Sequence, residues 1–183
     1  ADPDIQLDIL EAAQIAQLEM EIRTYEKSVA SDGPLAPYIW SLQGGHVALG
    51  EEIFKTSITA QCVRCHQLDG TGGEIGPDLT WIASRLTPEG LLSSLVTPQA
   101  EIADGYGTLS LTLHDDSIIA GTMVRADEQQ LLMKEPDGTI KSIAKDQVMS
   151  QTAAVSSMPP MGVILSKREL RDLMAFLISL KSP

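Results

Sequence analysis

The sequence has 183 residues, enough for one domain with an extension or for two small domains. Its net charge of −12 excludes nucleic acid and an anionic membrane as main partners, because both would repel it. No stretch has the length and apolarity of a transmembrane helix, so we expect no membrane insertion of this chain. The acidic excess is densest in residues 1–46, which hold eight Asp or Glu and two Lys or Arg.

The first 43 residues are predicted to form a helical extension that leads into the main domain. Residues 3–30 are expected to be one helix, because apolar side chains recur there at helical spacing. These side chains are Leu7, Leu10, Leu18, Ile22, Tyr25 and Val29. An extended stretch around Tyr38, Ile39 and Trp40 is expected next, followed by a flexible joint at Gly44-Gly45.

Three further helices are predicted in the main domain. One runs from Val47 to about Ala60 and is followed, after a short motif, by a loop over residues 67–81. Another starts after Thr87, which is a typical cap when a proline follows, and ends before Pro98. The last helix starts at Ser166, because Ser166 and Glu169 have the spacing of a capping box.

A two-residue periodicity replaces the helical one after residue 106. Leu109, Leu111 and Leu113 alternate with polar residues, as in a strand with one buried face. Residues 118–124, 130–134 and 139–143 are expected to form further strands, the last two joined by a turn at 136–138. The sequence therefore predicts a small antiparallel sheet over residues 106–149, placed between helices in the chain.

One short motif carries the chemistry. Cys62-Val63-Arg64-Cys65-His66 is the attachment signature of haem c. Two cysteines three positions apart on a turn present their sulfurs to the two vinyl groups of one porphyrin edge. The imidazole of His66 then lies beneath the ring, where one of its nitrogens binds iron. We predict one covalently attached haem c, with thioether bonds at Cys62 and Cys65 and His66 as the proximal iron ligand.

Two other kinds of site also use a C-x-x-C pair. A structural zinc site needs a second ligand pair, but the chain has no third cysteine, and His46 and His114 lack paired spacing. A thioredoxin-like dithiol follows a strand in a βαβ unit, whereas a predicted helix precedes this motif. Haem c is the favoured interpretation, with zinc binding and dithiol chemistry as the alternatives.

Around this motif the chain resembles the class I cytochrome c family. Gly50 and Phe54 match the small and aromatic residues of that family's first helix, and Leu173 and Phe176 match the residues of its last helix that pack across them. The resemblance implies that the carbonyl of Pro77 accepts a hydrogen bond from the proximal histidine. It also implies a mainly α fold, which is the class I cytochrome c helical fold with a small antiparallel β-sheet insert and an N-terminal helical extension.

Four segments narrow the resemblance to the planctomycete-type haem-binding domains. They are Gly-Glu-Glu-Ile-Phe at 50–54, Gly-Pro-Asp-Leu at 76–79, Ser-Ser-Met-Pro at 156–159 and Arg-Glu-Leu-Arg-Asp-Leu at 168–173. Such domains commonly end large exported proteins with propeller or HEAT-repeat regions. The expected organisation is an extension or linker over 1–43 and a cytochrome c domain over 44–183.

The second iron ligand is predicted to be Met158, because Met158-Pro159 matches the Met-Pro motif of the family and precedes the last helix. Met161 is the alternative on the same loop. His114 is a more distant one. Arg85, Arg64 and Arg125 are candidates for pairing with the haem propionates, with solvent exposure as the alternative.

Trp81 is expected either against the ring edge or in the core, and it completes the set of predicted cofactor-binding residues. The function expected from this set is transfer of single electrons between extracytoplasmic, for example periplasmic, redox proteins, without enzymatic turnover. The acidic surface favours partners with a basic docking patch. Because haem c is attached outside the cytoplasm, we expect an export signal to have preceded the chain. The alternatives are the haem domain of a larger dehydrogenase-type enzyme and a haem-based sensor or peroxidase-like protein.

Overall fold

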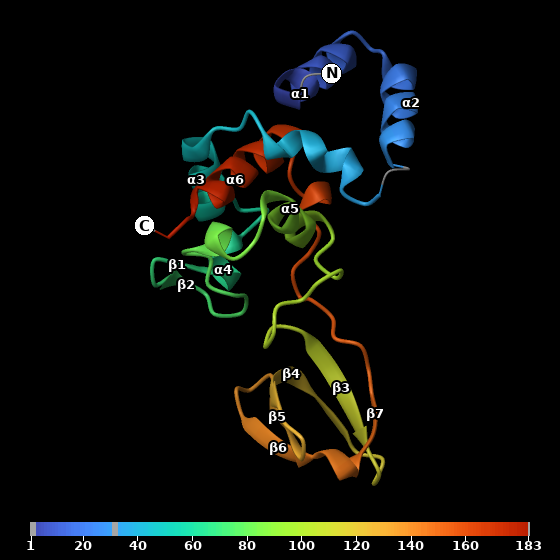
Figure 1. Ribbon diagram of the computed structural model, residues 1–183, viewed down its shortest axis with the longest axis vertical. Coiled ribbons are helices and arrows are strands. Elements are labelled where there is room, and N and C mark those ends of the chain that lie inside the picture. The colour runs from blue at the N-terminus through green and yellow to red at the C-terminus, as the bar shows by residue number, and fades with distance from the viewer. Residues whose placement is uncertain (1–2, 31–32, 183) are drawn as a thin grey trace. The chain divides into compact units, whose positions relative to one another are not determined.

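Residues 3–30 and 33–182 are described by a computed structural model, which divides into two units (Figure 1). The first unit contains residues 1–97 and 160–183, and the second contains residues 98–159. About 42% of the chain is helical and about 20% is in strands. The predicted mainly α fold with a small sheet is therefore wrong, because the sheet has five strands and a hydrophobic core of its own.

The first unit is largely helical. Its α-helices are α1 (Pro3–Ile15), α2 (Glu19–Ala30), α3 (Val47–Thr56), α4 (Cys62–Cys65), α5 (Pro88–Val96) and α6 (Lys167–Ser179). Its 3-10 helices are η1 (Ala36–Leu42), η2 (Ile82–Ser84) and η4 (Met161–Val163). Its two short strands, β1 (Gln67–Leu68) and β2 (Thr71–Gly72), form an antiparallel ribbon.

The core of the first unit lies where α3 crosses α6 (Figure 1). Gly50 permits this close approach, because a Cβ atom there would lie 1.9 Å from the backbone oxygen of Asp172. One helical turn later, Phe54 meets Phe176 with ring centroids 5.6 Å apart and planes tilted by 51°. The Asp172 carboxylate also accepts a hydrogen bond of 2.9 Å from the backbone N–H of His46, which fixes the start of α3.

The single helix predicted over residues 3–30 is interrupted. Gln17 has a left-handed backbone with φ of 58°, and it separates α1 from α2. The predicted apolar stripe is divided as a result: Leu7 and Leu10 are buried, whereas Leu18 is 43% exposed. The side chain of Val29 lies outside the described residues. The prediction of one continuous helix is therefore wrong at its centre.

The extended stretch predicted around Trp40 is also wrong, because these residues form the 3-10 helix η1. Pro37 occupies its first turn, where a missing N–H does no harm. The indole N–H of Trp40 donates to the carbonyl of Pro37 at 2.5 Å, and Trp40 is buried. This segment is thus a packed part of the first unit.

Two predicted helix starts are confirmed. The hydroxyl of Thr87 accepts the N–H of Gly90 at 3.1 Å and caps α5. Ser166 and Glu169 form the complete capping box of α6. The helix predicted from Val47 begins there but ends earlier than expected, at Thr56.

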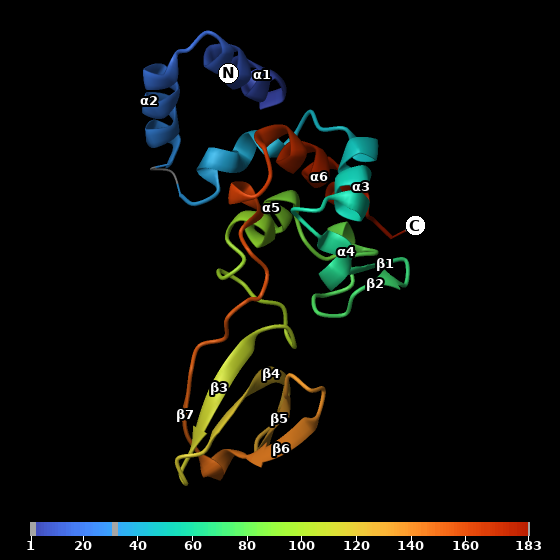
Figure 2. The ribbon, with the colours of Figure 1, turned by 180° about the vertical axis from the view of Figure 1, so that it is seen from behind.

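The second unit is an antiparallel sheet with strand order β6-β5-β4-β3-β7. Its strands are β3 (Thr108–Leu113), β4 (Ile118–Ala126), β5 (Gln130–Lys134), β6 (Ile140–Ala144) and β7 (Val148–Gln151). The first four were expected, and β7 was not; it pairs with β3, as Figure 2 shows. The inward face is a hydrophobic cluster of Leu109, Leu111, Leu131, Met133 and Ile143. Five paired strands bury enough apolar surface to form a core, which a small insert would not.

Among the described residues, no helix combines the length and the apolarity needed to cross a bilayer.

Candidate functional site

The C-x-x-C-H motif forms a single helical turn in the first unit. The turn, α4, follows Gln61, whose φ of 48° reverses the chain just before Cys62. The N–H of His66 closes the turn on the carbonyl of Cys62 at 2.9 Å. Both cysteines are half-buried free thiols. The backbone therefore places two thiols at the first and last residues of one short turn, and one imidazole at the residue that follows it.

The loop after the motif folds back onto it through backbone hydrogen bonds. The N–H of Gly73 donates to the carbonyl of Val63 at 2.9 Å, and the N–H of Gly76 donates to the carbonyl of Cys65 at 2.7 Å. A Cβ atom at Gly73 would lie 2.0 Å from the backbone oxygen of Arg64. Glycine is thus required at this contact, and the loop holds the turn in place.

The imidazole of His66 is held on two sides. Its Nδ1–H donates to the carbonyl of Pro77 at 2.8 Å, the hydrogen bond that the resemblance implied. The backbone of Gly76 lies against the ring, since a Cβ atom there would be 2.4 Å from Cε1. With Nδ1 engaged in this way, Nε2 is the nitrogen left to bind a metal.

Burial lowers the pKa of His66, and the hydrogen bond to Pro77 only partly opposes this effect. The ring is therefore neutral at neutral pH, which is the form that coordinates a metal. The structure thus supplies an oriented, uncharged imidazole next to the two thiols.

The thiols themselves do not have the properties of a redox dithiol. Burial raises the pKa of Cys62 to about 11, the nearby Cys65 adds to this effect, and a backbone hydrogen bond opposes it. A thioredoxin-like nucleophile needs the opposite shift. The surrounding elements also differ, because α3 precedes the motif and the β1–β2 ribbon follows it. Dithiol chemistry is not supported.

A zinc site finds no support either. Within residues 3–30 and 33–182, no three His, Cys, Asp or Glu side chains gather as a metal cluster. The two thiols and one imidazole of the motif match the donor set of haem c, which takes two thioethers and one nitrogen ligand from such a turn. The residues present therefore fit a covalently attached haem.

Two other predicted residues follow Pro77 on the same loop. The guanidinium of Arg85 donates to the backbone carbonyl of Asp78. Trp81 is 46% exposed and is therefore not a core residue. Arg64, within the motif, is exposed and donates to the side-chain oxygen of Gln61 at 3.1 Å. Arg85 therefore stabilises the loop after the motif through its hydrogen bond to the backbone of Asp78.

A small hydrogen-bond network in this loop was not predicted from the sequence. The hydroxyl of Thr80 accepts the backbone N–H of Asp69 at 2.9 Å and donates to the carboxylate of Asp78 at 2.5 Å. The bond from the Thr80 hydroxyl, together with a bond of 2.7 Å from the backbone N–H of Thr80, lowers the pKa of the Asp78 carboxyl. The contact of Gly76 with the imidazole of His66 was not predicted either. Neither feature has a local sequence signal, because both depend on how the loop returns to the motif.

The predicted second ligand and its alternative belong to different units. Met158 is half-buried near the end of the second unit, and its N–H donates to the hydroxyl of Ser156 at 3.2 Å. Met161 begins η4 in the first unit and is 4% exposed. His114 and Arg125 are exposed residues of the second unit.

Comparison with known proteins supports the same assignment. No curated protein sequence matches the chain significantly. Residues 47–110, from the start of α3 into β3, match the family model described as Cytochrome c. Domains of this family are typically extracytoplasmic and generally transfer electrons. The matched segment is similar to cytochrome c domains, a similarity that implies an iron-containing c-type haem attached covalently, and Cys62 and Cys65 have the required C-x-x-C-H context.

Proposed function

We propose that the protein is a monohaem c-type cytochrome that passes single electrons between redox proteins outside the cytoplasm. The observation that carries this proposal is the fixed imidazole of His66. The ring is held by the carbonyl of Pro77 and the backbone of Gly76. His66 directly follows Cys65, at the end of the turn that carries both thiols. Such an arrangement suits a permanently bound redox cofactor.

Each residue of the site has a distinct task in this proposal. Cys62 and Cys65 attach the haem, which supplies a one-electron change at its iron. His66 binds the iron, and its hydrogen bond to Pro77 makes the nitrogen more electron-donating. Met158 is the second ligand, whose thioether favours the ferrous state and raises the reduction potential.

We also propose that the domain is of the planctomycete type, with residues 44–183 as the cytochrome c domain and residues 1–43 as its extension. The position of the sheet in the chain supports this assignment. Its strands occupy residues 108–151, between α5 and α6, close to the predicted insert at 106–149. The partners proposed are redox proteins with a basic docking patch, because the chain has a net charge of −12.

The function is tested by a potentiometric titration of the purified holoprotein, followed optically. We expect a reversible transition that fits one electron and one haem per chain. The reduced protein should bind carbon monoxide weakly at neutral pH, because His66 and Met158 would both hold the iron and leave no position open. Tight binding of carbon monoxide would instead indicate an open position and favour a sensor or a peroxidase-like protein. An irreversible or multi-electron transition would also contradict the proposal.

The ligand assignment predicts different results for two matched variants, Met158→Leu and Met161→Leu. Leucine keeps the apolar volume of methionine but cannot bind iron. We expect Met158→Leu to lose the thioether–iron band in its magnetic circular dichroism spectrum. Its reduction potential should also fall by roughly a few tenths of a volt. Met161→Leu should keep both properties. The reverse pattern would assign the iron to Met161.

A further inference from the structure

The segment that carries Met158 has little regular secondary structure. Residues 152–160 connect β7 to η4, with an isolated bridge at Val155 as their only paired position. The backbone of such a connection is held mainly by the individual contacts that it makes with its surroundings. The contacts that hold this segment therefore decide where its methionine lies.

The side-chain amide of Gln99 holds the backbone of Ser156 through two hydrogen bonds. Its Nε2–H donates to the carbonyl of Ser156 at 3.0 Å, and its Oε1 accepts the N–H of the same residue at 2.9 Å. One side chain thus satisfies both backbone groups of one residue, as a neighbouring strand would. Gln99 and Ser156 both belong to the second unit, although 57 positions separate them in the chain.

These two bonds continue a pairing that begins one residue earlier. The N–H of Thr108 donates to the carbonyl of Val155 at 3.0 Å, and the N–H of Val155 donates to the carbonyl of Thr108 at 2.8 Å. Thr108 is the first residue of β3, so the strand itself supports the segment only up to Val155. Gln99 extends the pairing to Ser156 with a side chain in place of a strand.

A further hydrogen bond links Ser156 to the methionine. The hydroxyl of Ser156 accepts the backbone N–H of Met158 at 3.2 Å. Pro159 and Pro160 follow directly, and proline fixes its φ angle at about −65°. Pro160 has φ of −63°. The backbone around Met158 therefore has few free torsions once Ser156 is held.

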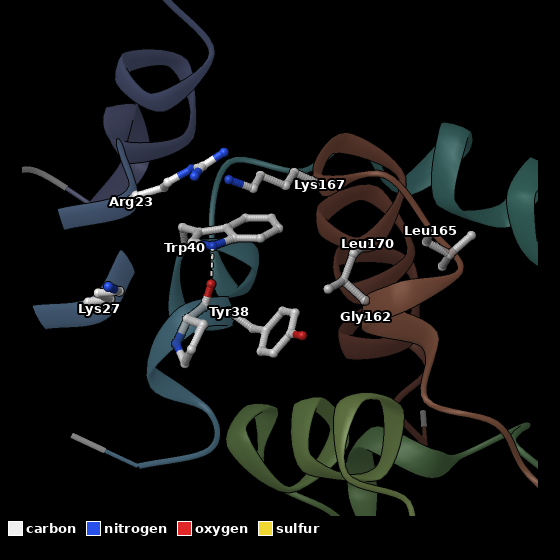
Figure 3. A pocket seen from close by; sticks show the side chains of 9 residues that line it. Arg23, Lys27, Tyr38, Trp40, Gly162, Leu165, Lys167 and Leu170 are labelled. Atoms are coloured by element: carbon white, nitrogen blue, oxygen red, sulfur yellow. Dashed lines mark hydrogen bonds between the residues drawn. The ribbon is translucent and has the colours of Figure 1, made fainter. Parts of the chain in front are cut away.

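The far end of the segment is held in the first unit. Met161 begins η4 and is buried. Tyr38 lies against the next residue, Gly162, where a Cβ atom would be 2.6 Å from the ring (Figure 3). Each end of the segment is thus fixed by contacts within its own unit. Of these contacts, the bonds of Gln99 are the ones with a hydrogen-bonded path to the backbone of Met158.

From this path we infer that Gln99 is a positioning residue for the second iron ligand. The inference rests on the proposed role of Met158. Gln99 acts through Ser156, whose backbone it holds, and so keeps the methionine in the conformation that binds iron. Without these bonds the segment populates conformations in which Met158 is released, and the iron is then open to an added ligand for a larger part of the time.

The inference is tested by titrating the ferric holoprotein with imidazole, which competes with a thioether for the iron and is followed optically. The apparent affinity rises with the fraction of protein whose iron is open. We expect Gln99→Leu to bind imidazole about tenfold more tightly than the unmodified protein, because two hydrogen bonds are lost. Gln99→Ala should give the same result with a smaller side chain. Gln129→Leu is the matched control and should leave the affinity unchanged, since it replaces an exposed glutamine of the same unit between β4 and β5.

Met158→Leu separates this inference from the proposed function. If Met158 is the ligand, this variant binds imidazole at least as tightly as Gln99→Leu does. Tight binding by Met158→Leu together with unchanged binding by both Gln99 variants would overturn the inference alone. Unchanged binding by Met158→Leu would overturn the ligand assignment and the role of Gln99 with it. Unfolding by denaturant is measured in parallel, because a purely structural Gln99 would alter stability without altering the affinity for imidazole.

Discussion

A double variant with Cys62→Ser and Cys65→Ser, produced in a host that attaches haem c, is expected to contain no covalently bound haem. Serine cannot form a thioether, and the chain has no other cysteine to replace the lost bonds. Peroxidase staining of the denatured protein should be negative, and its mass should equal that of the bare polypeptide. Each single variant should retain one thioether bond and therefore part of the stain.

The control for this experiment is Ile58→Ser. Ile58 lies between α3 and the motif and is 85% exposed, so a polar side chain there leaves the fold intact. This variant should attach haem as well as the unmodified protein does. A positive stain in the double variant would mean that the haem is held through some other residue, and the assignment of the motif would then fail.

The second large effect is expected from Gly50→Ala. In an isolated helix this change is stabilising by about 1 kcal/mol, because alanine has the higher helix propensity. Here the added Cβ atom would lie 1.9 Å from the backbone oxygen of Asp172 and 2.7 Å from the Cβ of Phe176. Backbone atoms of a packed helix cannot rotate away, so α3 and α6 must separate. We expect the free energy of unfolding to fall by about 3 kcal/mol or more, measured by chemical denaturation.

Gly90→Ala in α5 is the matched control for this change. A Cβ atom at Gly90 would meet its nearest neighbour, the hydroxyl oxygen of Thr87, at an ordinary distance of 3.5 Å. Its unfolding free energy should therefore stay the same or rise slightly. If both variants were equally stable, close contact at Gly50 would not determine the packing of α3 on α6.

Local patterns predicted most of the elements. The alternation of Leu109, Leu111 and Leu113 identified β3, and the Ser166–Glu169 spacing identified the start of α6. Strand β7 was missed because it has only four residues and gains its stability from pairing with β3, far away in the sequence. That fifth strand is part of what makes the sheet larger than the small one expected, and its omission contributed to the wrong fold class.

The break between α1 and α2 could not be predicted for a different reason. Residues 15–19 contain neither glycine nor proline, and the left-handed residue is Gln17. A non-glycine residue in that conformation has no clear sequence signature. Similarly, η1 was taken for an extended stretch because two prolines and three large apolar residues fit either conformation.

The candidate site was easier to predict than the fold. The spacing of Cys62, Cys65 and His66 follows from the chemistry of one cofactor, and the resemblance implied the hydrogen bond to Pro77. The contact of Gly76 with the imidazole was not predictable, since it depends on how the loop returns to the motif.

The contacts of Gly76 and Pro77 with His66 reduce the side-chain entropy that metal binding would otherwise cost. A histidine side chain in a flexible chain rotates about two bonds, and arresting those rotations costs about 1 kcal/mol. Here the contacts with Gly76 and Pro77 arrest them when the loop folds. Because the ring is already oriented, its Nε2 atom can bind a metal without a further loss of side-chain entropy. In the proposed cytochrome, the affinity of His66 for iron would thus depend in part on Gly76 and Pro77, which orient the ring.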